Sequence, residues 1–77
     1  MAKVKLTLSD IASILGVDVS VVNRHVSGSE LLLEKEGGEV YVTVSRFRGI
    51  INLLRFYGFY LLASAIESRL EDFLASQ

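Results

Sequence analysis

The stretch LSDIASILGVDVSVVNRHV, residues 8–26, contains two short helical patterns separated by a single glycine. In the first pattern, Thr7 is placed as an N-cap, and Asp10 three residues later completes a capping box. The apolar residues that follow at helical spacing predict one buried stripe: Leu8, Ile11, Ala12 and Leu15. We expect this helix to end at Gly16, because glycine adopts the left-handed conformation at little cost.

A second short helix is predicted directly after this glycine. Asp18 is placed to cap it, since a carboxylate is favourable at the positive end of a helix. Val19, Val22 and Val26 recur at helical spacing and predict its inner stripe. Its polar residues fall on the other side, which we expect to be open: Ser20, Asn23, Arg24 and Ser27. Gly28 is expected to end the helix.

The next region, ELLLEKEGGEVYVTV (residues 30–44), predicts a β-hairpin, because a Gly–Gly pair separates two β-rich runs. Pairing outward from the glycines predicts the register Lys35 opposite Val40, Leu33 opposite Val42 and Leu31 opposite Val44. The segment of residues 3–6 alternates polar and apolar side chains, which favours a third strand. Val4 and Leu6 are then expected to join the apolar face of the sheet.

From the cap residue Ser45 onward, the pattern over residues 46–76 is again helical and unusually apolar. Residues that recur at spacings of three and four form a stripe: Ile51, Leu54, Gly58, Leu61 and Ala65. A helix that is apolar nearly all round is either buried or spans a membrane. The apolar window of residues 50–66 is short for a span and contains Arg55, so burial is favoured. Gly58 is expected either to bend this helix or to split it in two.

The size of the chain favours self-association. It has 77 residues, 51% of them hydrophobic, and no cysteine. Such a chain buries only a modest share of its surface on folding, and no disulfide can compensate. We therefore expect one domain, residues 1–77, that hides part of its apolar surface in a second copy. The stripe on residues 46–76 is the predicted dimer interface.

Two short helices around a tight turn, followed by a hairpin, resemble the winged helix-turn-helix family of DNA-binding domains. Ala12 matches the small residue where the two helices touch, and Gly16 matches the turn glycine. Val17 and Val22 match the buried positions that follow, VVNRHV resembles the end of a recognition helix, and the hairpin matches the wing. The resemblance covers residues 3–46. It implies an α+β fold, a small winged helix-turn-helix with a β-hairpin wing and a long C-terminal dimerisation helix. Many winged domains place a further helix before this pair, and here the C-terminal region is expected to complete the core instead.

The resemblance implies that the second helix enters the major groove of duplex DNA. Forked polar side chains read base edges there, since arginine donates two bonds to guanine and asparagine pairs with adenine. The candidate base-contacting residues are Ser20, Asn23, Arg24 and Ser27. Basic residues outside this helix would hold the phosphates, and the candidates are Lys3, Lys5, Lys35, Arg46 and Arg48. The wing tip carries Glu34, Glu36 and Glu39, which phosphates repel, so we do not expect it to enter a groove.

These features also have plainer interpretations. A polar face on a short helix is usually a solvated face, and lysines on an edge strand guard against aggregation. A net charge of −1 argues against an indiscriminate polycation that coats nucleic acid. It also suits the alternative function, a winged helix used as a protein-interaction module.

The leading hypothesis is a homodimer that binds double-stranded DNA sequence-specifically as a transcriptional regulator. A plasmid-partition or chromatin protein would share every feature named so far. Two copies related by a two-fold axis would read half-sites about 34 Å apart on one face of the duplex.

Several further expectations concern what the protein lacks and where it acts. The sequence contains no catalytic motif, and its single His25 cannot build a zinc site alone, so we expect neither an enzyme nor a metal, cofactor or small-molecule ligand. The start MAKVKLTLSD lacks the apolar segment of a signal peptide, which predicts a cytoplasmic, nucleoid-associated protein. The absence of cysteine and proline, with abundant Val, Ile and Leu, favours an archaeal or viral source.

Overall fold

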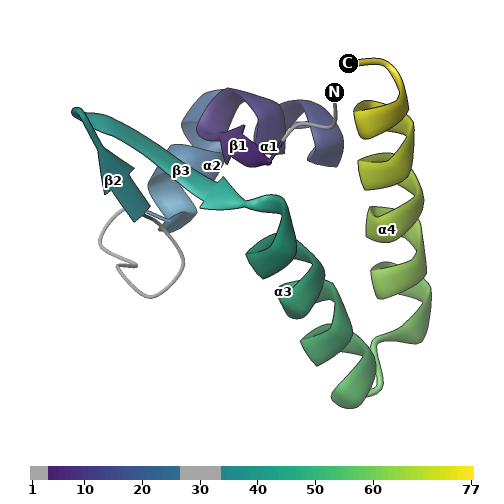
Figure 1. Ribbon diagram of the computed structural model, residues 1–77. Coiled ribbons are helices and arrows are strands. Elements are labelled where there is room, and N and C mark those ends of the chain that lie inside the picture. The colour runs from purple at the N-terminus through teal and green to yellow at the C-terminus, as the bar shows by residue number, and fades with distance from the viewer. Residues whose placement is uncertain (1–3, 27–33) are drawn as a thin grey trace.

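Helices and strands combine in a small α+β domain in the computed structural model, which describes residues 4–26 and 34–77 (Figure 1). Within these ranges the elements are β1 (Lys5–Thr7), α1 (Leu8–Leu15), α2 (Val19–Val26), β2 (Glu34–Glu36), β3 (Glu39–Thr43), α3 (Val44–Phe56) and α4 (Tyr60–Ala75). The strands form one antiparallel sheet in the order β1–β3–β2. The predicted α+β class is confirmed at this level.

The helix α1 begins and ends where the sequence predicts. The Oγ1 of Thr7 accepts a hydrogen bond from the backbone N–H of Asp10 at 3.1 Å, and the Asp10 carboxylate accepts one from the Thr7 N–H at 3.0 Å. The capping box is therefore complete. Gly16 has a φ of 71°, and the Val17 N–H donates to the Ala12 carbonyl at 3.0 Å, so a left-handed turn ends the helix.

The buried faces of α1 and α2 differ in part from the predicted stripes. In α1, Ile14 is buried and takes the inward position expected for Leu15, which is exposed. In α2, Val22 is buried as predicted. Val17 and Val19, both expected to be buried, are 42% and 45% exposed. Val19 is exposed because α2 packs mainly against α1, so only a narrow face of α2 is covered, and Val17 lies in the turn before α2.

The sheet confirms the hairpin register set by the glycine pair, since Lys35 lies opposite Val40. The rest of the prediction for this region falls outside the described residues: the partners Leu31 and Leu33, the helix end at Gly28 and the side chain of Val26. The predicted third strand is present, and it places buried Leu6 opposite buried Val42. Val4 precedes this strand and is exposed, so its predicted place on the apolar face is wrong.

The C-terminal region forms two helices, so the single long helix over residues 46–76 is wrong. Gly58 has a φ of 92°, and its N–H donates to the Arg55 carbonyl at 2.9 Å, which ends α3 and turns the chain back. The helices α3 and α4 then run side by side in opposite directions (Figure 1). Of the two outcomes expected at this glycine, splitting is the one observed.

The helix α4 also packs against α1, so the C-terminal region completes the core as expected. Its inner side chains Ala63 and Leu70 are fully buried. The buried residues of the described chain form one cluster: Leu6, Ile11, Ala12, Ile14, Val22, Val42, Phe47, Ile51, Ala63 and Leu70. No helix within residues 4–26 and 34–77 has the length and apolar character needed to cross a membrane.

Candidate nucleic-acid interface

The helix α2 presents a polar edge at the surface of the molecule. Ser20, Asn23 and Arg24 are all exposed, whereas Val22 is 5% exposed and belongs to the core. Ser20 and Arg24 are four residues apart and therefore lie one above the other on the same side of the helix. Three of the four predicted base-contacting residues thus share an open helical edge, and Ser27 lies outside the described residues.

The charges along α2 are unevenly distributed. At its start, the Asp18 carboxylate accepts a hydrogen bond from the Ser20 N–H at 2.9 Å, and this bond lowers the pKa of Asp18. At its other end lie Arg24 and His25, whose Nδ1 is 2.9 Å from the Val21 carbonyl oxygen. A phosphate is consequently repelled from the N-terminal end of α2 and attracted towards its last turn.

The candidate phosphate contacts differ in how they are engaged. Lys5 forms an ion pair with Glu36 of the hairpin, which raises the pKa of Lys5, and its Nζ lies 4.6 Å from the centre of the Tyr41 ring. Arg46 is exposed in the first turn of α3. Arg48 pairs with Glu71 of α4, so it is held where those two helices meet. Lys3 lies outside the described residues, as does the side chain of Lys35.

An ion pair at the surface does not prevent a basic residue from meeting DNA. The pairs of Lys5 and Arg48 are both solvent-exposed, and exposed pairs contribute little to stability. A phosphate oxygen can therefore replace the carboxylate at little cost. Lys5 lies in β1 opposite Thr43, the last residue of β3, and Arg46 lies in the first turn of α3, so both are near the junction of β3 and α3.

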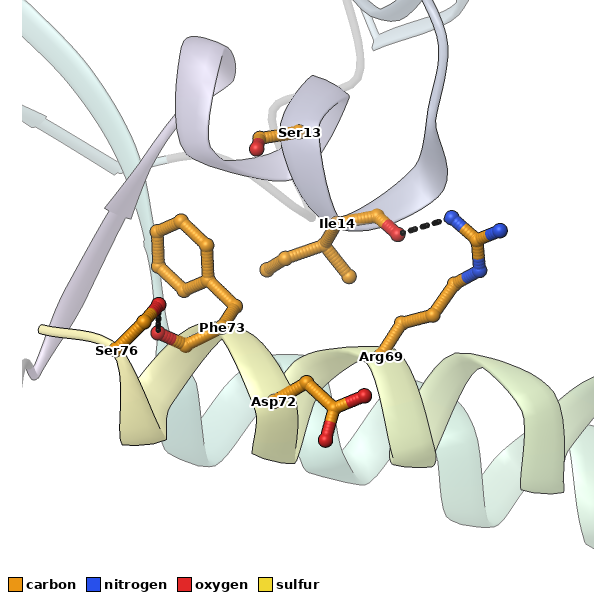
Figure 2. A pocket seen from close by; sticks show the side chains of 6 residues that line it. All are labelled: Ser13, Ile14, Arg69, Asp72, Phe73 and Ser76. Atoms are coloured by element: carbon orange, nitrogen blue, oxygen red, sulfur yellow. Dashed lines mark hydrogen bonds between the residues drawn. The ribbon is translucent and has the colours of Figure 1, made fainter.

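A polar groove of about 510 Å³ lies between α1 and α4 (Figure 2). Its lining residues are Ser13, Ile14, Arg69, Asp72, Phe73 and Ser76. Figure 2 shows Arg69 reaching across from α4, where its Nη1 donates to the Ile14 carbonyl at 3.3 Å. Because the C-terminal end of a helix carries partial negative charge, this arginine supplies α1 with the cation that its own last turn lacks. The groove therefore lies where Arg69 links α4 to the end of α1, two elements that both contribute to the core.

The role of Arg69 is not evident from the amino-acid sequence. Arg69 is 55 residues away from Ile14, and nothing in the helical pattern around it indicates that contact. The nearest signal is indirect: α1 ends in a left-handed glycine without a basic residue in its last turn. Such a helix end is often satisfied from elsewhere in the fold.

The predicted dimer stripe is divided by the fold. Ile51 is 1% exposed and lies in the core of its own chain, and Leu54 is half-buried against that core, so these two side chains face inward. Gly58, Leu61 and Ala65 are exposed. The reason is the turn at Gly58, which folds one half of the stripe onto α4.

A larger apolar surface surrounds that turn. We define the aromatic tip as the large apolar side chains between residues 53 and 62 that are more than half exposed: Leu53, Phe56, Tyr57, Phe59, Tyr60, Leu61 and Leu62. The ring centres of Phe56 and Tyr57 lie 5.5 Å apart in an edge-to-face arrangement. In Figure 1 the tip is at the opposite end of the molecule from α2 and the hairpin.

Across residues 4–26 and 34–77, no three His, Asp or Glu side chains gather as a metal site requires. Comparison of the chain with protein-family models, with curated proteins and with solved structures gave no match in any of the three. The functional assignment therefore depends on the residues and surfaces described above.

Proposed function

We propose that the protein binds double-stranded DNA as a homodimer and acts as a transcriptional regulator. The observation that carries the proposal is the open edge of α2, where Ser20, Asn23 and Arg24 face solvent while Val22 anchors the opposite side. An exposed helix with forked polar side chains fits the major groove, in which every base pair presents a distinct hydrogen-bonding pattern.

The order of the elements supports a winged helix-turn-helix arrangement. Two short helices meet at the left-handed turn of Gly16, and the hairpin β2–β3 follows them along the chain. The strand β1 pairs with β3 and so ties the hairpin to the start of α1. Through buried Leu70 and the bond from Arg69, α4 supports α1 where many winged domains use a preceding helix.

The distribution of charge gives the proposed orientation on DNA. The exposed glutamates of the hairpin, Glu34, Glu36 and Glu39, are repelled by phosphates, so the hairpin stays outside the groove. Arg24 approaches the bases from the last turn of α2. Lys5 and Arg46 contact phosphates, which fixes the register without reading sequence.

Selection of bound duplexes from random DNA tests this function, combined with a salt titration of the selected duplex. We expect a symmetric consensus and an affinity that falls steeply with salt, because each phosphate contact releases counterions. Enrichment of no sequence together with salt-dependent binding would instead indicate a chromatin protein. The absence of duplex binding at low salt would contradict the proposal.

A second candidate function is a protein-interaction module. The observation that favours it is the acidic tip of the hairpin, where Glu36 already forms an ion pair with Lys5. The net charge of the chain is also negative, at −1. Such a module would show little affinity for any duplex at any salt concentration. The salt titration therefore separates the two candidates directly.

A further inference from the structure

The aromatic tip exposes more apolar surface than a small monomer usually does. Its four aromatic residues are between 56% and 81% exposed, and its leucines between 51% and 89%. With ~150–250 Å² for a complete aromatic side chain, the rings alone offer roughly 500 Å². The leucines bring the tip to roughly 800 Å², whereas the largest apolar patch of a typical monomer measures about 300–600 Å².

This area is what one partner contributes to a stable protein–protein interface. Standard interfaces bury about 800 Å² on each side. Their centres are enriched in tyrosine and phenylalanine and depleted in charge. The tip has this composition, since Phe56, Tyr57, Phe59 and Tyr60 follow one another around a single glycine.

The shape of the tip suits contact with a copy of itself. Residues 58–62 line an apolar depression of about 460 Å³. Gly58 leaves it open on one side, because no atom lies within 4 Å of where a β-carbon would stand. Leu61, one of its lining residues, is 89% exposed, and Phe56, the last residue of α3, is 81% exposed. A two-fold contact brings the same patch to both partners, and this patch combines highly exposed side chains with a depression that can receive them.

The charges that border the tip argue against a lipid partner. Helices that bind membrane surfaces combine apolar residues with lysines and arginines that hold anionic headgroups. Here residues 52–66 contain a single cation, Arg55, whose guanidinium contacts Glu67 at 2.6 and 3.3 Å and Asn52 at 3.2 Å. One cation is too few to hold the several anionic headgroups that such a large apolar surface would meet.

We infer that the aromatic tip is a symmetric interface through which two copies of the chain associate. This surface replaces the stripe expected from the sequence, in which Ile51 is buried and Leu54 half-buried within each chain. The inference rests on the proposed function in one respect, because it names the surface that would form the proposed homodimer. The association itself requires no DNA. Because α2 lies at the other end of the molecule, the polar edge of α2 stays open in both copies of such a dimer (Figure 1).

Sedimentation equilibrium without DNA tests the inference, with the parent chain, Leu61→Glu and the control Val4→Glu. Both substitutions place a carboxylate at a highly exposed apolar position, but Val4 precedes β1 and lies outside the tip. At micromolar concentration, the parent and the control are expected to sediment as dimers, with twice the 8.5 kDa mass of one chain. Leu61→Glu is expected to weaken association roughly 100-fold, because two carboxylates would meet in one apolar interface.

Circular dichroism of Leu61→Glu shows whether the variant is folded, and Phe56→Glu provides a second test on the other helix of the tip. A parent chain that is monomeric, or tip variants that remain dimeric, would overturn the inference. So would a monomeric parent that sediments with phosphatidylserine vesicles, since the tip would then be a lipid-binding surface. If the chain dimerises but binds no duplex, the DNA proposal fails and this inference stands.

Discussion

At the scale of single residues, base selectivity is expected to depend most on Arg24. Its guanidinium is exposed on the open edge of α2, and a bidentate contact with guanine contributes about 1–3 kcal/mol of discrimination. Arg24→Ala should therefore lower the preference for the selected site over a single mismatch by roughly 10–100-fold. Competition binding with matched and mismatched duplexes measures this ratio.

Arg46→Ala is the matched control for that experiment, because Arg46 lies outside α2. It should weaken binding to all duplexes by a similar factor and leave the ratio between them unchanged. If both variants bind as the parent does, the assignment of this face to DNA is wrong.

The contact between Gly16 and Arg69 makes a prediction about stability. Gly16 has a φ of 71°, and a β-carbon there would lie 3.0 Å from the Arg69 Nη1. Gly16→Ala should cost about 1–2 kcal/mol for the left-handed backbone alone. That corresponds to a decrease in Tm of roughly 4–8 °C per kcal/mol for a domain of this size.

Thermal denaturation followed by circular dichroism measures the effect, with Gly49→Ala as the control. Gly49 lies inside α3, at ordinary φ and with open space around it, so alanine should stabilise the chain there by a few tenths of a kcal/mol up to about 1 kcal/mol. An unchanged Tm for Gly16→Ala would show that Arg69 and the turn do not hold α1 in place.

The exposure of a side chain could be predicted where it depends only on residues nearby in the sequence. The exposure of Ser20, Asn23 and Arg24 follows from helical spacing, and the structure agrees with it. The division of the predicted stripe does not follow from spacing, because Ile51 and Leu61 both belong to it, yet Ile51 is 1% exposed and Leu61 is 89% exposed. Only the contact with α4 decides which of those residues are covered.

At the scale of the elements, the predicted boundaries were set by short-range chemistry. The Thr7 capping box, the Gly16 turn and the register across Gly37 and Gly38 each involve residues within a few positions of one another. The residues around Gly58 do not decide between the two expected outcomes, a bent helix and a split one. The split is favoured in the fold because α4 can then pack against both α3 and α1.

The ion pair between Arg55 and Glu67 links α3 to α4 and predicts a pH dependence. Its hydrogen bond lowers the pKa of the Glu67 carboxyl below the ordinary 4.5. The stability that this pair contributes is therefore fully present above that pH and is lost as the pH falls through the lower value in the folded chain. We expect the parent to have a higher Tm than Glu67→Gln at neutral pH, and the difference to shrink as the pH falls below 4.5.

Thermal melts of the two proteins across this pH range provide the measurement. Glutamine keeps the shape of the side chain and removes its charge, so the comparison isolates the ionised form. A difference in Tm that stays constant from neutral to acidic pH would mean that the pair does not stabilise the helical hairpin.

At the scale of the whole molecule, two surfaces of different character lie at opposite ends (Figure 1). One end carries the polar edge of α2 and the charged hairpin, and the other carries the aromatic tip. The sequence alone predicted an apolar C-terminal region and a second copy, but it could not locate the interface, since that depended on the turn at Gly58. If the two surfaces act as proposed, variants of each should affect either DNA binding or association and leave the other intact.

A titration of the isotopically labelled chain with its selected duplex, followed by backbone amide chemical shifts, shows whether α2 is the surface that meets DNA. We expect the largest changes in α2 at Ser20, Asn23 and Arg24, smaller ones at Lys5 and Arg46, and none at the aromatic tip. Large changes confined to α3 and α4, with none in α2, would contradict this proposal.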